Sequence, residues 1–288
     1  MKKYLALLLV GIMVFSLVAC NNNTAANEPK EGNTPAENVA ETTEESGANK
    51  LAMIKESGKL VMGTNANYPP FEFHKQVDGK DQILGFDILL AQEIAKDLGV
   101  ELEIQDMEFS AVLAAMDTGI IDVGIAGINR TEEREKTMDF SDVYFESSYT
   151  VLVKKDDLGK FNEPEKLTAE NARIGVQTAT VQEGMANDIE GIEVISIAKT
   201  PDLVSQLKSG YIDAILTENT VADMYAAENE DLVSDPDGKF VGEAGAVIAV
   251  PKGQGELLAE INKTIQKLKA EGKLDEFYQQ GIDLAISK

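Results

Sequence analysis

The chain has 288 residues and a formal net charge of −24 at pH 7. A charge of this sign argues against nucleic acid as a partner, because a phosphate backbone would be repelled. The single cysteine excludes an intramolecular disulfide framework.

The N-terminus has the pattern of an export signal. Two lysines precede an apolar run over residues 4–19, which is short for a membrane-spanning helix. The run ends in Leu17-Val18-Ala19-Cys20, and a small residue before a cysteine at this point resembles a bacterial lipobox. We therefore expect residues 1–20 to be a lipoprotein signal peptide, with Cys20 acylated and held on the extracytoplasmic face of the cell membrane. A plain secretory signal is the alternative.

Residues 21–50 differ in composition from the rest of the chain. They are mostly Asn, Thr, Glu, Ala, Gly and Pro, with Val39 as the one sizeable aliphatic residue. Such a segment cannot bury enough apolar surface to offset the entropy lost on ordering. We expect a disordered tether that reaches roughly 30 Å on average and carries a globular part, residues 51–288.

Short strands alternate with amphipathic helices at the start of the globular part. The predicted strands are residues 59–63, 100–104 and 120–128. The predicted helices are residues 86–98, which Gly99 would end, and a helix through Met116 for which Ser110 is a plausible N-cap. This order of strands and helices indicates an α/β fold with largely parallel sheets.

One pattern occurs twice. A helix end, a glycine, an Ile-Asp pair and an apolar strand come together around Asp122 and again around Asp213, and polar residues follow each strand. Ligands in open α/β sheets bind beyond the carboxyl ends of strands, so we expect two similar lobes with a cleft between them. An apolar run over residues 246–251 and two helices after it could complete either lobe.

Seven motifs lie in a fixed order along the globular part. They occupy residues 63–73, 85–87, 126–134, 139–142, 175–180, 212–214 and 277–278. Their order and spacing resemble the polar amino acid binding proteins of ABC importers, extracellular solute-binding protein family 3. The resemblance covers nearly the whole chain after the tether.

The resemblance implies a two-lobed, type II periplasmic-binding-protein fold. Each lobe would be a mostly parallel sheet flanked by helices. Residues 51–147 and 246–288 would form lobe 1, and residues 148–245 would form lobe 2. Two crossing segments, near residues 146–148 and 242–245, would act as the hinge.

A free amino acid carries a carboxylate and an ammonium group, so its pocket needs a fixed cation and a fixed anion. Arg134 is the candidate cation: Thr131 can cap a helix that begins there, and both a helix N-terminus and a guanidinium favour a carboxylate. Glu218, after the second repeated strand, is the candidate anion. The resemblance implies these two roles. The alternatives are an ordinary arginine in a charged helix start and a solvated glutamate in a chain with 50 acidic residues.

Further residues of the pocket follow from the resemblance. Gly127 lets the backbone approach the ligand closely. Asn129 stands where the family usually has Ser or Thr, so its side-chain contact is open. Thr180 corresponds to a threonine that touches the ligand carboxylate, while Tyr68 and Phe109 would flank the aliphatic part.

The identity of the amino acid stays open at this stage. Asn65 and Gln177 are the expected readers of the ligand side chain, and two neutral amides fit a neutral polar ligand such as glutamine. Glu72 or other acidic residues could instead select a cation.

The sequence therefore predicts a monomeric binding protein without cofactor, metal or enzymatic activity. It would close its lobes on a free polar amino acid, because a zwitterion satisfies Arg134 and Glu218 together only when the lobes meet. It would then deliver the amino acid to the transmembrane subunits of an ABC importer.

Two alternatives belong to other classes. A cyclohexadienyl dehydratase-like enzyme shares the fold, but the sole histidine, His74, is expected at the surface, and no hydrolase, metal-protease or phosphate-loop motif is present. A sensory ligand-binding module would carry a spanning helix after the domain, and none follows before Lys288.

Overall fold

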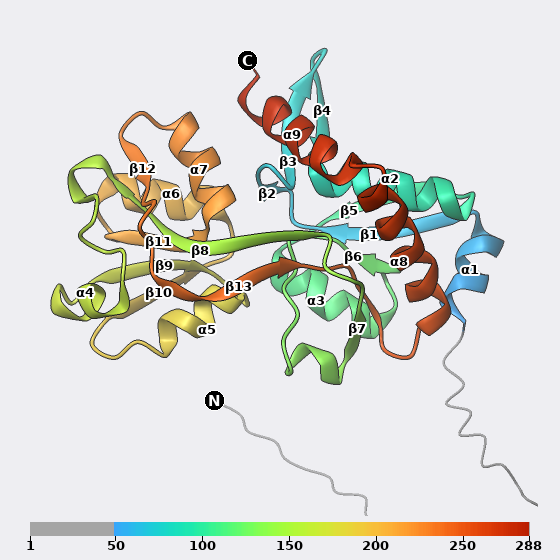
Figure 1. The fold of residues 1–288 in the computed structure, drawn as a ribbon, viewed down its shortest axis with the longest axis horizontal. Coiled ribbons are helices and arrows are strands. Elements are labelled where there is room, and N and C mark those ends of the chain that lie inside the picture. Colours follow the sequence, from blue (N-terminus) through green and yellow to red (C-terminus); the bar gives the residue numbers. More distant parts are fainter. Residues whose placement is uncertain (1–48, 288) are drawn as a thin grey trace, which may run out of the picture. The chain divides into compact units, whose positions relative to one another are not determined.

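The computed structural model describes residues 49–287. The predicted signal peptide, the acylated Cys20 and nearly all of the predicted tether lie outside the described residues. Within the described part, no helix is long and apolar enough to cross a membrane. Residues 49–287 form two lobes, and each lobe is a β-sheet flanked by helices (Figure 1).

The first lobe is built on a five-stranded sheet with the order β5-β1-β6-β14-β7. Its strands are β1 (Lys59–Thr64), β5 (Glu101–Asp106), β6 (Val123–Gly124), β7 (Met138–Phe140) and β14 (Ala249–Pro251). Its helices are α1 (Lys50–Ser57), α2 (Phe86–Leu98), α3 (Phe109–Thr118), α8 (Gly255–Ala270) and α9 (Lys273–Ile286), with a 3-10 turn η1 (Arg134–Lys136). A smaller antiparallel sheet joins β2 (Asn67–Tyr68), β3 (Glu72–Val77) and β4 (Lys80–Leu84).

The second lobe is built on a six-stranded sheet with the order β10-β9-β11-β8-β12, where β13 also pairs with β8. Its strands are β8 (Phe145–Lys154), β9 (Arg173–Gln177), β10 (Glu193–Ile197), β11 (Ala214–Glu218), β12 (Leu232–Ser234) and β13 (Phe240–Ala246). Its helices are α4 (Pro164–Ala169), α5 (Val181–Asn187), α6 (Thr200–Ser209) and α7 (Asn219–Glu228), with a 3-10 turn η2 (Lys155–Asp157).

Both sheets are mixed, so the prediction of mostly parallel sheets is wrong. β1 is parallel to β5 and β6, but β14 runs antiparallel to β6 and β7. β9 is parallel to β10 and β11, but β8 is antiparallel to β11, β12 and β13. The reason is the path of the chain. β8 enters the second sheet from the first lobe, and β14 comes after β13, which returns to the first lobe. Each therefore runs away from the cleft, antiparallel to neighbouring strands that run toward it.

Several predicted elements hold and two need correction. β1 and α2 lie where expected, and Gly99 ends α2 in the left-handed conformation with φ 75°. Helix α3 begins at Phe109 with Glu108 as its N-cap, so Ser110 lies inside its first turn. The predicted strand over residues 120–128 is regular only in β6, because the chain turns at Gly127 with φ 54°.

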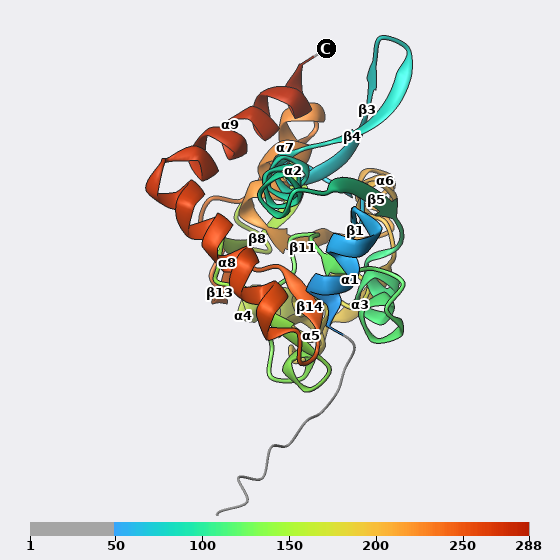
Figure 2. The same cartoon turned by 90° about the vertical axis from the view of Figure 1, so that its right-hand side faces the viewer.

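Two strands run between the lobes in Figure 1, β8 on the way out and β13 on the way back. They pair antiparallel, with Ser147 opposite Ala244 and Glu146 opposite Gly245. The two segments predicted to form the hinge are therefore neighbours in one ribbon. Helix α9 packs along α2 and α8 and also contacts α7 of the second lobe (Figure 2).

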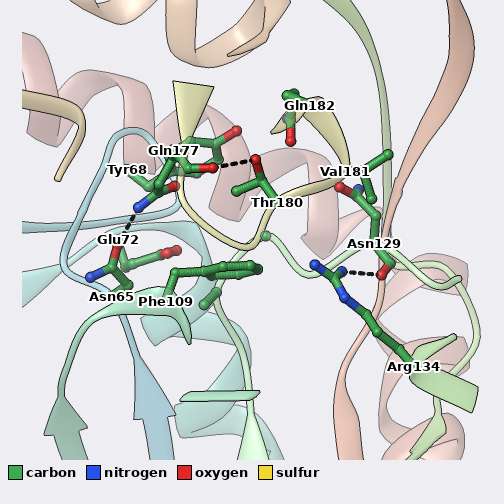
Figure 3. A pocket seen from close by; sticks show the side chains of 12 residues that line it. Asn65, Tyr68, Glu72, Phe109, Asn129, Arg134, Gln177, Thr180, Val181 and Gln182 are labelled. Carbon is green, nitrogen blue, oxygen red and sulfur yellow. Dashed lines mark hydrogen bonds between the residues drawn. The ribbon is translucent and has the colours of Figure 1, made fainter. Parts of the chain in front are cut away.

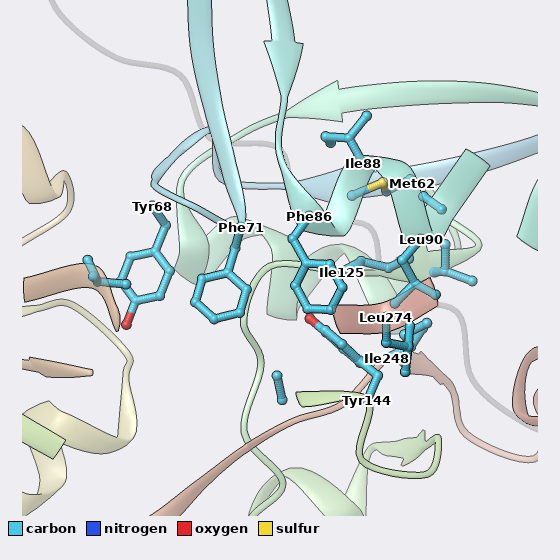
Figure 4. Close-up of a cluster of buried hydrophobic side chains, with 14 of the residues drawn as sticks. Met62, Tyr68, Phe71, Phe86, Ile88, Leu90, Ile125, Tyr144, Ile248 and Leu274 are labelled. Atoms are coloured by element: carbon cyan, nitrogen blue, oxygen red, sulfur yellow. The ribbon is translucent and has the colours of Figure 1, made fainter. Parts of the chain in front are cut away.

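A row of aromatic rings leads from the cleft into the core of the first lobe (Figure 4). Phe71 lies 5.9 Å from Tyr68 and 6.1 Å from Phe86, and Phe86 lies 5.6 Å from Tyr144 between ring centroids. Phe71, Phe86 and Phe73 are all buried. Burial of each such side chain contributes about 1.5–3 kcal/mol, so this row makes the cleft wall of the first lobe rigid.

Candidate ligand-binding site

A small pocket, narrow in this arrangement of the lobes, lies between them (Figure 3). The first lobe lines it with Asn65, Tyr68, Glu72, Phe109, Ala126, Gly127, Asn129 and Arg134, and the second with Gln177, Thr180, Val181 and Gln182. Eight of the nine residues predicted for ligand binding are in this set. The ninth, Glu218, does not line the pocket but contacts the lining residue Asn129.

The strands of both lobes deliver these residues at their carboxyl ends. Asn65 directly follows β1, Gln177 ends β9, and Glu218 ends β11. This is the edge at which an open α/β sheet binds its ligands. The structure thus brings together residues that lie more than 150 positions apart in the chain.

Arg134 is the cation of the pocket. Its guanidinium donates to the carbonyl of Asn129 at 2.5 Å and to the carbonyl of Ala179 in the second lobe at 2.9 Å. It also lies over the Phe109 ring, 5.4 Å from the centroid. Burial lowers the pKa of Arg134 to about 10, so the side chain is still charged at neutral pH.

The local structure at Arg134 differs from the prediction in one respect. The Thr131 hydroxyl accepts a hydrogen bond from the Arg134 backbone N–H at 3.2 Å, as expected of a cap. The element that follows is η1, a single 3-10 turn, rather than an α-helix. A macrodipole needs several aligned turns, so the positive charge at this point comes from the guanidinium itself.

Glu218 is buried, so the alternative of a solvated loop glutamate is wrong. Its carboxylate accepts from the Asn129 amide at 3.3 Å and from the Ser147 hydroxyl at 2.9 Å. Burial raises the pKa of Glu218 to about 7, although these two hydrogen bonds act to lower it. Among residues 49–287 no lysine, arginine or histidine forms an ion pair with it.

Asn129 joins the cation to the anion. Its carbonyl holds Arg134 and its side-chain amide holds Glu218, so one residue of the first lobe touches both charges. The resemblance implies a hydroxyl at position 129, whereas here the side-chain amide of Asn129 donates to Glu218 of the second lobe. Two residues earlier, a Cβ on Gly127 would lie 3.2 Å from the Tyr68 ring, which explains the need for glycine.

The predicted readers of the ligand side chain contact each other across the cleft. The Gln177 amide donates to the side-chain oxygen of Asn65 at 2.8 Å, and the Asn65 amide donates to the carbonyl of Met107 at 2.7 Å. The Tyr68 hydroxyl lies 3.4 Å from that of Thr217. These bonds place the two amides and the tyrosine on one wall of the pocket.

Thr180 has a local structural role besides lining the pocket. Its hydroxyl donates to the Gln177 carbonyl at 2.7 Å and accepts from the Glu183 N–H at 3.3 Å, which caps α5. The preceding Ala179 adopts a left-handed conformation with φ 65° at the position where the family usually has glycine. The loop therefore keeps its turn despite the changed sequence.

Glu72 is a pocket residue that the sequence named only as a possible selector. It is fully buried, and the group beside its carboxyl is the carboxyl of Asp87. Burial, with Asp87 nearby, raises the pKa of Glu72 well above its usual range. Its cross-strand pairing with Tyr68 could have revealed it, because directly paired residues point to the same face of a sheet.

Ala126, Val181 and Gln182 also line the pocket, and the sequence analysis did not name them as site residues. Each lies within two positions of a predicted residue, so motif position alone was too coarse to separate them. Within the described chain, no cluster of His, Cys, Asp and Glu side chains could hold a metal ion. His74 is exposed, as expected, and lies between Asp81 and Asp106.

Comparison with known proteins decides the family. Residues 60–282 match the family described as bacterial extracellular solute-binding proteins, family 3. The chain belongs to this family. The resemblance drawn from the sequence motifs is thereby confirmed at the family level.

Two related proteins are similar in sequence to this chain along nearly their full length. The arginine-binding extracellular protein ArtP of Bacillus subtilis is 32% identical over 281 residues, which is 96% of either chain. The ABC transporter glutamine-binding protein GlnH of the same organism is 32% identical over 285 residues, 98% of either chain.

A solved structure shows the same fold. The substrate-binding protein AbpA of Streptococcus pneumoniae, bound to L-arginine, superposes with a TM-score of 0.79 at 38% identity, over 82% of this chain and 100% of its own. The two-lobed periplasmic-binding-protein fold is thus confirmed. These three relatives are named as binding proteins, in agreement with the prediction that the chain is not an enzyme.

Proposed function

We propose that this solute-binding protein captures a free polar amino acid between its lobes and delivers it to an ABC importer. The observation that carries the proposal is that two opposite charges contact Asn129, the half-buried Arg134 from the first lobe and the buried Glu218 from the second. A free amino acid presents the two complementary charges on neighbouring atoms.

The ligand carboxylate is assigned to Arg134. A guanidinium binds a carboxylate through two parallel N–H bonds, and such charge-assisted bonds are about twice as strong as neutral ones. The ligand would replace the carbonyls of Asn129 and Ala179 as acceptor, and the Phe109 ring supports the guanidinium from below.

The ligand ammonium is assigned to Glu218. A buried carboxylate without a cation costs free energy, and an ammonium removes that cost. Because Arg134 and Glu218 belong to different lobes, a ligand that binds both favours the closed arrangement over the open one. We assign residues 51–147 and 246–288 to the first lobe and residues 148–245 to the second, with the hinge in β8 and β13.

A cationic ligand side chain is the first choice. Glu72 presents a buried carboxyl that forms no ion pair with a cation of residues 49–287, and in Figure 3 it lies near Asn65 and Phe109, on the other side of the pocket from Arg134. An unpaired buried acid favours a positive group. Arginine fits this chemistry and is the ligand named for ArtP and AbpA, while glutamine, named for GlnH, is the main competitor.

The position of the protein in the cell is part of the proposal. The lipobox-like motif at Cys20 supports acylation and attachment to the outer face of the cell membrane. We assign residues 21–48 to the tether, since Asn49 and Lys50, which the sequence analysis included in it, begin α1. A monomer on such a tether would reach the transmembrane subunits of an importer without leaving the membrane.

A ligand screen tests the function. A thermal-shift series over the standard amino acids should raise the unfolding temperature most for arginine, since a ligand that binds only the folded state stabilises it. Calorimetry then measures the affinity of each hit. No shift with any amino acid would contradict the proposal, and a shift with glutamine alone would correct the ligand class.

A further inference from the structure

Asp87 is a buried acid to which the proposed ligand contacts assign no role. It is the second residue of α2, belongs to the Gly85-Phe86-Asp87 motif and is fully buried. One carboxylate oxygen accepts from the N–H of Gly127 at 3.0 Å, and the Tyr144 hydroxyl lies 2.9 Å from both oxygens. Within residues 49–287 it forms no ion pair.

The bond to Gly127 fixes the part of the chain that carries the binding charges. Gly127 lines the pocket in the left-handed region, and two residues later Asn129 holds both Arg134 and Glu218. A left-handed glycine has many accessible conformations, so a strong acceptor for its N–H restricts them. The orientation of the Asn129 peptide therefore depends on Asp87.

The bonds to Tyr144 reach the crossing strands. The Tyr144 ring packs edge-on against Phe86, as Figure 4 shows, and its backbone N–H donates to the carbonyl of Ala246 at 2.9 Å. The next residue, Phe145, begins β8 and lies opposite Ala246 of β13. Asp87 thus touches both the pocket segment and the start of the ribbon between the lobes.

The groups that face Asp87 are acidic or phenolic. Glu72 of β3 and Glu218 of β11 interact with it electrostatically, and Tyr144 donates to it. Burial raises the pKa of Asp87 to about 6, while hydrogen bonds with Gly127, Tyr144 and Glu72 act to lower it. At neutral pH the carboxylate accepts from both partners, and protonation at lower pH removes one of its acceptor positions.

We infer that Asp87 is a positioning residue of the ligand site. Its carboxylate holds residues 126–129 and the start of β8 in the geometry in which Arg134 and Glu218 reach one ligand, without touching that ligand itself. The inference rests on the proposed function, because its measure is the affinity for the amino acid identified in the screen.

Two substitutions at this position separate hydrogen bonding from charge. Asp87→Ala removes the acceptor for Gly127 and should weaken binding roughly tenfold to a hundredfold, the usual effect of a lost buried hydrogen bond to a charged group. Asp87→Asn keeps one carbonyl oxygen for Gly127 and an amide for Tyr144, so we expect recovery to within about threefold of the unaltered protein at pH 7.5. Asp97→Ala is the control, since Asp97 is on the same helix and bonds only Thr264 and Lys267.

The dependence of ligand affinity on pH is a second measurement, because a residue with a purely structural role would not change it. Glu218 is present in both proteins, and its pKa should be lower in Asp87→Asn because the charge of Asp87 is gone, so its titration shifts the ratio of the affinities in the same direction. Between pH 7.5 and pH 5 the ratio should shift toward Asp87→Asn by up to roughly tenfold, because position 87 takes up a proton in the unaltered protein and not in the variant.

Equal losses in the Ala and Asn variants, or unchanged affinity in a folded Ala variant, would overturn the inference. If Asp87→Ala fails to fold, Tyr144→Phe tests the inference instead. This variant keeps the ring packing but loses the hydroxyl that donates to Asp87, so it should weaken binding about threefold. Unchanged affinity in this variant would overturn the inference. Absence of amino acid binding in the unaltered protein would instead contradict the proposed function.

Discussion

The two ends of each sheet treat their acidic residues in opposite ways. At the outer ends, Asp122 pairs with Lys50 at 2.9 Å and Asp213 pairs with Arg173 at 2.6 Å, and each carboxylate also accepts a backbone N–H. At the cleft, Glu218 and Glu72 are buried and form no ion pair with a cation of residues 49–287. The outer acids hold the fold together, whereas the cleft acids have raised pKa values that a cationic group of a ligand would lower.

The pKa directions follow the same division. Partial burial acts to raise the pKa of Asp213, but the hydrogen bonds and charge of Arg173 outweigh it and lower the pKa. Burial raises the pKa of Glu218 to about 7. A lowered acid pKa stabilises the fold above the unfolded pKa, and a raised one destabilises the fold there. The cleft therefore carries a stability cost that only a cationic partner removes.

Arg134→Ala should produce the largest effect on binding. Removing the guanidinium leaves the ligand carboxylate buried without a partner, so we expect at least a hundredfold loss of affinity. The unfolding temperature without ligand should change little, because Arg134 bonds only two carbonyls. Calorimetry measures the affinity, and Arg130→Ala serves as the control because Arg130 is exposed and pairs with Glu135. Equal effects in both variants would contradict the assignment.

Glu218→Gln should separate binding from stability. Binding should weaken roughly a hundredfold, since the ammonium loses its counter-charge. The rise of the pKa from 4.5 to about 7 costs about 3 kcal/mol at about 1.4 kcal/mol per pKa unit. The variant should therefore be more stable than the unaltered protein above pH 7, and the difference should fade as the pH falls to about 4.5. Denaturant unfolding at pH 8 and at pH 4.5 measures the difference in stability. A variant that is less stable than the unaltered protein at pH 8 would show that the charge of Glu218 does not destabilise the fold.

Binding by the unaltered protein should weaken as the pH falls below 7. Protonation of Glu218 removes the anion that the ammonium needs, and each pH unit below its pKa of about 7 should cost up to tenfold in affinity. Calorimetry at pH 8, 7 and 6 follows the loss, with Glu218→Gln as the variant that keeps only the smaller dependence due to Asp87. An affinity that is constant over the series would exclude Glu218 as the ammonium partner.

Glu72→Gln should act on ligand choice rather than on binding in general. The affinity for arginine should fall about tenfold, while the affinity for glutamine should stay the same or rise, because a neutral amide no longer selects a cation. The ratio of the two affinities, measured by calorimetry, is the readout. An equal change for both ligands would place Glu72 outside the specificity of the pocket.

Asp213→Asn should have the smallest effect on binding. The ion pair between Asp213 and Arg173 is partly exposed, so its loss should lower the stability by only about 1 kcal/mol. This difference should disappear at acidic pH, where the aspartate is protonated. Ligand affinity should not change, because Asp213 is at the outer end of β11. A loss of affinity would show that the outer acids also shape the cleft.

The sequence predicted the parts of the fold that depend on local patterns. Helix α2 followed from its apolar face and from Gly99, and the repeated Ile-Asp connectors identified two lobes. The direction of β8 and β14 could not be read in this way, because strand direction depends on which lobe the chain enters, and no local pattern records that.

Glu218 lies at the end of its strand, as the sequence indicated, but its burial depends on packing against Ser147 of another strand. The contacts of Glu72 and Asp87 depend on how α2, β3 and the segment around Gly127 meet, which is a property of the tertiary structure alone.

The most direct test compares arginine with agmatine, which has the same guanidinium side chain and an amine but no carboxylate. Calorimetry on the unaltered protein and on Arg134→Ala yields four affinities. If Arg134 holds the ligand carboxylate, the substitution weakens arginine binding at least a hundredfold and leaves the weak binding of agmatine unchanged. An equal loss for both ligands would contradict the assignment of Arg134 and with it the split zwitterion site.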